Sequence, residues 1–96
     1  MDNRKVIKAM KALSNENRFE IFMEIVNSNK QSSFEGEECF IYDLIKNLNI
    51  GAPTISHHLK ELSNADLIIT ERRGKYIVAK INEEMIEELG NILKLE

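Results

Sequence analysis

Residues 52–68 read APTISHHLKELSNADLI, and this stretch decides the fold. Ile55, Leu59 and Leu62 recur at i, i+4 and i+7, the spacing that places apolar side chains on one face of a helix. When the helix is projected at about 100° per residue, His57 falls on the side opposite this apolar stripe. The stretch therefore predicts a helix with one buried face and one polar outer face.

Two adjacent histidines lie in the middle of this helix, and they suggest a metal site, an acid–base catalyst or contacts outside the chain. His58 lies at the edge of the apolar stripe and His57 away from it, whereas metal ligands on a helix need to be about one turn apart. Ser56 and His57 do not face each other, and no third group is placed to orient a base. The pattern favours an external contact for His57. For His58 it favours packing, with the ring nitrogen hydrogen-bonded locally.

The segments on either side complete a recognisable unit. Residues 40–51, FIYDLIKNLNIG, predict a short helix that stops at its glycine, directly before a helix over residues 52–63. Residues 68–81, IITERRGKYIVAKI, change to a period of two and predict a hairpin that turns at Arg73-Gly74. A short helix, a tight turn, a second helix with a polar face and a basic hairpin describe a winged helix-turn-helix. The expected class is mainly α with a small β-hairpin (α+β).

The remaining segments predict helices at both ends of the chain. One helix covers residues 6–13, a second follows after Ser14 and Asn15, which can cap it, and the last covers residues 82–95. Residues 28–38 read as a loop, either a solvated insertion or an effector-sensing one. The apolar stripes of the terminal helices exceed what a small unit needs, although internal packing is the alternative. We expect a dimer interface there, formed by Val6, Met10, Met85, Leu89 and Ile92.

Length and composition limit the possible classes. Ninety-six residues predict a single domain over 1–96, and no apolar run approaches the roughly 20 residues that span a bilayer. Cys39 is the only cysteine, so one chain can form neither a disulfide nor a thiol-based zinc cage. We expect a cytoplasmic protein without membrane contact, cofactor, bound metal or enzymatic activity.

The charge is unevenly distributed. The net charge is −3, yet residues 1–11 carry +3 and residues 52–80 carry +2, while residues 12–51 and 81–96 carry −4 each. The helix with the two histidines thus lies in one of two positive segments. An acidic total therefore does not exclude a polyanionic partner.

Three segments resemble the ArsR-type transcriptional repressors. ALSNENRFEIF (12–22) is similar to the family's opening motif, PTISHHLKELSNADLI (53–68) to its recognition helix, and ERRGKYIVAKIN (71–82) to its wing. The resemblance runs from Ala12 to Asn82, with a longer loop than is typical of the family. It implies a homodimer that binds double-stranded operator DNA, with helix 52–63 in the major groove.

The resemblance also suggests which residues contact DNA. Thr54, Ser56 and His57 fall where family members contact bases or phosphates, and Lys60 also points outward. In the wing, Arg72, Arg73 and Lys75 can neutralise phosphates. Ala52 departs from the polar residue that many relatives have before the proline, so base readout can differ there.

The family's metal sites are not matched. The positions of the paired cysteines of metal-sensing members hold Phe40 and Tyr42, Cys39 is one residue out of register, and helix 82–95 contains no histidine or cysteine. We therefore expect a repressor that does not sense metals at these sites, with an unknown effector. Two alternatives stay open: a winged-helix regulator controlled by redox state or a small ligand, and a protein-interaction module without DNA binding.

Overall fold

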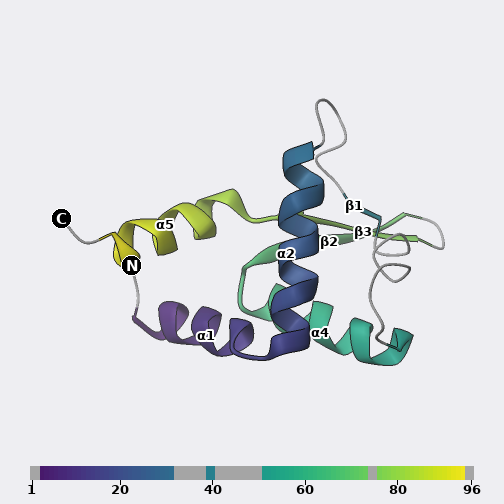
Figure 1. Cartoon of the computed structure of the whole chain (residues 1–96), viewed down its shortest axis with the longest axis horizontal. Coiled ribbons are helices and arrows are strands. Elements are labelled where there is room, and N and C mark those ends of the chain that lie inside the picture. Colours follow the sequence, from purple (N-terminus) through teal and green to yellow (C-terminus); the bar gives the residue numbers. More distant parts are fainter. Residues whose placement is uncertain (1–2, 32–38, 41–50, 74–75, 95–96) are drawn as a thin grey trace.

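The computed structural model describes residues 3–31, 39–40, 51–73 and 76–94. Four helices and three strands lie in these ranges: α1 (Asn3–Leu13), α2 (Glu16–Gln31), β1 (Cys39–Phe40), α4 (Ala52–Asn64), β2 (Ile68–Arg73), β3 (Tyr76–Ile81) and α5 (Glu83–Leu93). In Figure 1, α2 crosses the middle of the molecule, and α1 and α5 extend from it towards the same end. The predicted class, helical with a small hairpin, is confirmed. The short helix expected before residue 51 falls on residues outside the described ranges.

The sheet has one strand more than predicted. β2 and β3 pair antiparallel from Ile68 opposite Ile81 to Arg73 opposite Tyr76, as expected for the wing. β1 adds to the other side of β3, so the strand order is β1-β3-β2. The sequence reading was wrong at Phe40, which it assigned to the start of a helix. A strand of two residues has no period to detect, and its position is decided by pairing with a distant partner.

The start of α2 agrees with the prediction from the sequence, and its end differs from that prediction. Asn15 is the N-cap, because its side-chain oxygen accepts a hydrogen bond from the backbone N–H of Arg18 at 3.0 Å. The helix continues to Gln31, so the predicted loop 28–38 is wrong in its first four residues. Extending an existing helix by one residue adds a hydrogen bond without a new nucleation cost, so polar residues alone do not stop it.

A Schellman turn connects α4 to the wing. The N–H of Leu67 donates to the carbonyl of Leu62 at 3.1 Å, and that of Asp66 donates to Ser63 at 3.0 Å. Asp66 occupies the left-handed region at φ 61°, where an aspartate is tolerated better than most residues. Asn82 holds this turn from the other side, because its amide donates to the carbonyl of Asp66 at 3.0 Å. α4 and the β2–β3 hairpin are thereby fixed to each other.

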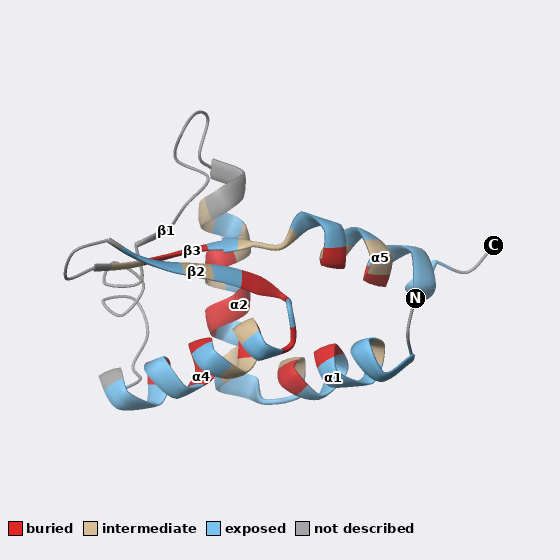
Figure 2. Ribbon diagram, turned by 180° about the vertical axis from the view of Figure 1, so that it is seen from behind, coloured by how far each residue is buried: buried red, intermediate tan, exposed pale blue. Residues whose placement is uncertain are grey.

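A single core cluster joins all four helices to the sheet (Figure 2). This cluster corrects part of the expected dimer interface, because Met85 and Leu89 are only 4% and 8% exposed within the single chain. Their i, i+4 stripe is the side that α5 turns towards its own core, and Val6 is partly buried against the same core cluster. Met10 and Ile92, at 43% and 44% exposed, remain at the surface.

Candidate nucleic-acid interface

The outer face of α4 carries the polar residues expected there. Ile55, Leu59 and Leu62 are at most 5% exposed and anchor the helix in the core. On the remaining surface of the helix lie the four residues predicted to contact DNA, all of them exposed: Thr54, Ser56, His57 and Lys60. α4 therefore presents hydroxyl, imidazole and ammonium groups along a helix whose other side is fixed by packing.

The first turn of α4 has no side-chain cap. Gly51 is the N-cap and cannot supply a side-chain oxygen, and Pro53 within the first turn has no N–H to satisfy. The ladder begins with the N–H of Ile55, which donates to Gly51 at 3.0 Å. Exposed N–H groups at a helix start attract anions, so this end of α4 is suited to a phosphate.

His58 packs inside, as predicted, and its hydrogen-bond partner is a distant residue. The side chain is 5% exposed, and its Nδ1 accepts a hydrogen bond from Nε of Arg18 on α2 at 3.3 Å. Nη1 of the same arginine donates to the carbonyl of Ala12 at the end of α1, at 3.2 Å. The expectation of a local partner for His58 was wrong, because on a buried helix face the nearest donor comes from the helix packed against it.

This arrangement keeps the imidazole of His58 neutral. Burial lowers the pKa of His58 below its ordinary value of 6.5, and electrostatic interactions with Arg18 and His57 lower this pKa further. Because Nδ1 accepts from a guanidinium, the remaining ring proton is on Nε2. His58 therefore acts as a neutral acceptor that ties α4 to the junction of α1 and α2.

The two histidine rings do not converge on a common point. Their centroids are 5.8 Å apart with planes tilted by 50°, and His57 is exposed while His58 is buried. Within the described residues, no group of three or more His, Cys, Asp or Glu side chains could hold a metal ion. The structure brings His57 together with Ser56 and Lys60 on the surface, and it separates His58 from them.

The wing is described up to its tip. Arg72 is exposed on β2 opposite Ile77, and Arg73 is the last residue of that strand. The predicted position Lys75 and the turn at Gly74 lie outside the described residues, as does the side chain of Arg73. Of the three predicted cations of the wing, Arg72 is the one whose side chain the structure describes, and it lies on the surface.

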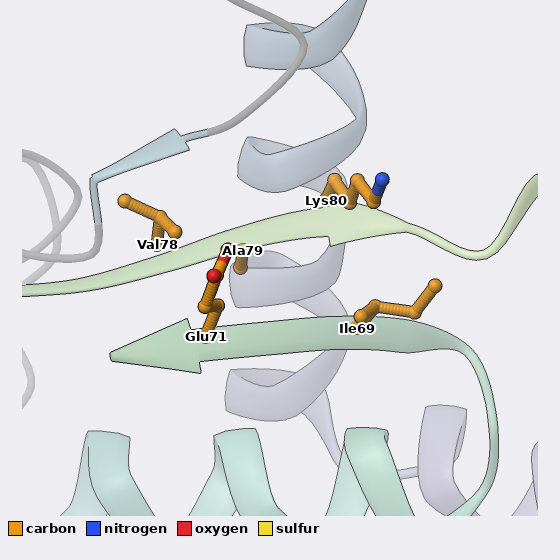
Figure 3. Close-up of a pocket in the computed structure, with 5 residues that line it drawn as sticks. All are labelled: Ile69, Glu71, Val78, Ala79 and Lys80. Carbon is orange, nitrogen blue, oxygen red and sulfur yellow. The ribbon is translucent and has the colours of Figure 1, made fainter. Parts of the chain in front are cut away.

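The hollow on the hairpin is too small for a substrate. It has a volume of about 40 Å³ and lies between β2 and β3, where five side chains line it (Figure 3): Ile69, Glu71, Val78, Ala79 and Lys80. Ligand pockets usually measure several hundred Å³. This feature therefore gives no support to an enzyme site, and α4 with the wing remains the candidate surface.

The sequence analysis did not identify Arg18, whose guanidinium hydrogen-bonds the buried side of α4 to the junction of α1 and α2. The signal was available, because Arg18 is the arginine of the opening motif ALSNENRFEIF and stands on a heavily apolar helix. A charged residue at the edge of a buried face usually has a specific partner.

Comparisons with known proteins agree with this geometry. A family model described as "Bacterial regulatory protein, arsR family" matches residues 32–70. The chain is 30% identical to the arsenical resistance operon repressor of Bacillus subtilis, over 90% of this chain and 74% of that protein. It is 26% identical to the repressor of the same name from Staphylococcus xylosus, over 99% of this chain and 83% of that protein. The solved structure of an ArsR-like transcriptional regulator from Rhodococcus sp. RHA1 superposes with a TM-score of 0.73 at 20% identity. The superposition covers 95% of this chain and 77% of that chain.

Proposed function

Because this chain belongs to the ArsR family of bacterial DNA-binding regulators, we propose that it is a repressor that binds an inverted-repeat operator as a homodimer. The observation that carries the proposal is the division of α4 into two sides. Its apolar stripe is buried, while Thr54, Ser56 and His57 are exposed next to the wing. A helix with these properties fits the major groove, where hydroxyl and imidazole groups can read base edges.

The cationic residues have a different proposed role from the polar ones. Lys60 on α4 and Arg72 on β2 are exposed and can pair with phosphates, which fix the register of the protein on the duplex. We assign Arg73 and Lys75 to the same role because they belong to the same wing. Base reading then rests on Thr54, Ser56 and His57, and affinity rests largely on the cations.

The homodimer is proposed from the apolar surface of the terminal helices. Ile7 and Met10 on α1 and Ile92 and Leu93 on α5 are between 43% and 64% exposed. The start of α1 and the end of α5 lie at the same end of the molecule (Figure 1). Apolar residues concentrated at one end favour burial against a second copy. A two-fold dimer presents two recognition helices, and it therefore requires an inverted repeat.

We further propose that arsenite and thiophilic metals do not control this protein through the thiolate sites of its family. Both of the relatives described above are named as arsenical resistance operon repressors. Arsenite and soft metal ions need several thiolates at one centre, and this chain has a single cysteine, Cys39. Another signal, such as a small ligand, redox chemistry or a change in protein level, then releases the operator.

Selection of bound sequences from a random duplex pool tests this function. A repressor enriches one motif that contains two inverted half-sites about one helical turn apart, or a multiple of that distance. A protein-interaction module without DNA binding enriches nothing and is not retained on duplex DNA at low salt. Enrichment of a single unrepeated half-site would contradict the dimeric arrangement and leave DNA binding intact.

A further inference from the structure

Basic side chains gather on α1, outside the proposed recognition helix and wing. The helix Asn3–Leu13 contains no acidic residue, and its four cations are all exposed: Arg4, Lys5, Lys8 and Lys11. Residues 1–11 carry a net charge of +3, compared with +2 for residues 52–80. The larger of the two positive segments therefore has no role in the function proposed so far.

Three of these cations share one side of α1. Arg4, Lys8 and Lys11 are spaced i, i+4 and i+7, so they form a basic stripe along the helix. Ala9, which is fully buried, lies on the other side of the helix. Lys5 is exposed as well, but it lies roughly 90° around the helix from the middle of the stripe.

The helix that carries the basic stripe lies along the same edge of the molecule as α4 (Figure 1). α1 and α4 are in contact and lie one after the other along the long axis (Figure 1). Ala9 and Ala12 of α1 enter the same core cluster as Leu59 of α4, and the basic stripe of α1 and the polar residues of α4 are exposed to solvent. The molecule is 42 Å long in this direction, which exceeds one turn of B-DNA.

We propose that the basic stripe of α1 is a second phosphate-binding surface, which holds the DNA backbone beside the segment that α4 reads. The inference rests on the proposed DNA binding and adds a contact that the recognition helix and wing do not supply. α5 has the opposite character, because Glu83, Glu84 and Glu87 are exposed and negative. Its charges repel a duplex, so the protein offers a polyanion one favourable side.

The salt dependence of DNA affinity tests the stripe. Lys8→Gln/Lys11→Gln removes two charges and keeps good helix formers. Each lost phosphate contact lowers the slope of log K against log salt by about 0.9, so four contacts in a dimer lower it by about 3.6. The same loss should occur on a selected operator and on a random duplex of about three helical turns, because phosphates carry no sequence information.

Lys5→Gln is the matched control, because it removes one charge from the same helix outside the stripe. We expect its slope to stay within about 0.5 of the wild-type value, while Lys11→Gln alone lowers it by about 1.8 in the dimer. An unchanged slope for the double variant, or equal reductions of the slope for Lys5→Gln and Lys11→Gln, would show that the basic stripe does not bind phosphates. A wild-type protein that binds no duplex at all would instead refute the proposed function, so the two failures are distinguishable.

Discussion

Nε of Arg18 donates a hydrogen bond to Nδ1 of His58 at 3.3 Å and thereby ties the buried side of α4 to α2. The same guanidinium donates to the carbonyl of Ala12 at the end of α1. His57, the next residue on α4, is exposed on the proposed DNA face. The orientation of that face therefore depends on the Arg18–His58 hydrogen bond, which lies on the buried side of α4, away from the proposed DNA face.

The first prediction concerns this contact. Arg18→Met keeps an apolar stem and removes both hydrogen bonds, and it leaves the Nδ1 of buried His58 without its donor. We expect the free energy of unfolding to fall by about 2 kcal/mol in urea titration. Lys60→Met, an exposed control on α4, should change it by less than about 0.5 kcal/mol. Equal losses of unfolding free energy for the two substitutions would show that Arg18 does not stabilise the fold through these hydrogen bonds.

The second prediction concerns pH. The pKa of His58 is lowered in the folded protein, so above pH 6.5 both folded and unfolded states hold the ring neutral and stability is complete. Below pH 6.5 the unfolded chain takes up a proton first, and stability falls by up to about 1.4 kcal/mol per pH unit until the folded pKa is reached.

Urea titrations at pH 7.5 and pH 5.5 measure this loss. His58→Gln retains an acceptor for Arg18 but does not titrate, so its loss of stability between the two pH values should be smaller than that of the wild type. The exposed control His57→Gln removes only the smallest of the three causes that lower the pKa of His58, so its loss of stability should stay close to that of the wild type. A wild-type loss no larger than that of His58→Gln would show that His58 does not cause it.

The helical skeleton of this fold was predictable because its signals are local. The i, i+4, i+7 stripe of Ile55, Leu59 and Leu62 and the period-two wing each follow from a few neighbouring residues. The sequence signalled that Arg18 needs a partner, but the identity of that partner and the pairing of strand β1 were not predictable, since each partner lies about 40 residues away. The burial of Leu89 was missed for a related reason. A stripe on a terminal helix has the same spacing whether it faces its own core or a second copy.

The third prediction concerns assembly and follows from that correction. Ile92 is 44% exposed, so Ile92→Glu should leave the chain folded and convert the dimer to monomers in sedimentation velocity. Asn91→Glu, an exposed neighbour that gains the same charge, should stay dimeric. Leu89→Glu places a charge in the core and should instead unfold the chain. If the Ile92→Glu protein sedimented as the wild-type dimer does, this end of the molecule would not be the interface.

The fourth prediction concerns metals. With one cysteine per chain, zinc, cadmium and arsenite have no set of converging thiolates to bind. Operator affinity should therefore stay within about twofold when each is added at micromolar concentration, relative to a chelator-treated sample. A tenfold loss of affinity corresponds to about 1.4 kcal/mol of coupling and would reveal a sensing site in this protein.

The most direct test of the central claim, that the outer face of α4 reads DNA sequence, is a comparison of two dissociation constants at one salt concentration. The wild-type protein should bind a selected operator about a thousandfold or more tightly than a scrambled duplex. His57→Ala should reduce that ratio by about tenfold to a hundredfold and leave the affinity for the scrambled duplex unchanged. Equal wild-type affinity for the two duplexes, or an equal loss on both in His57→Ala, would contradict the account.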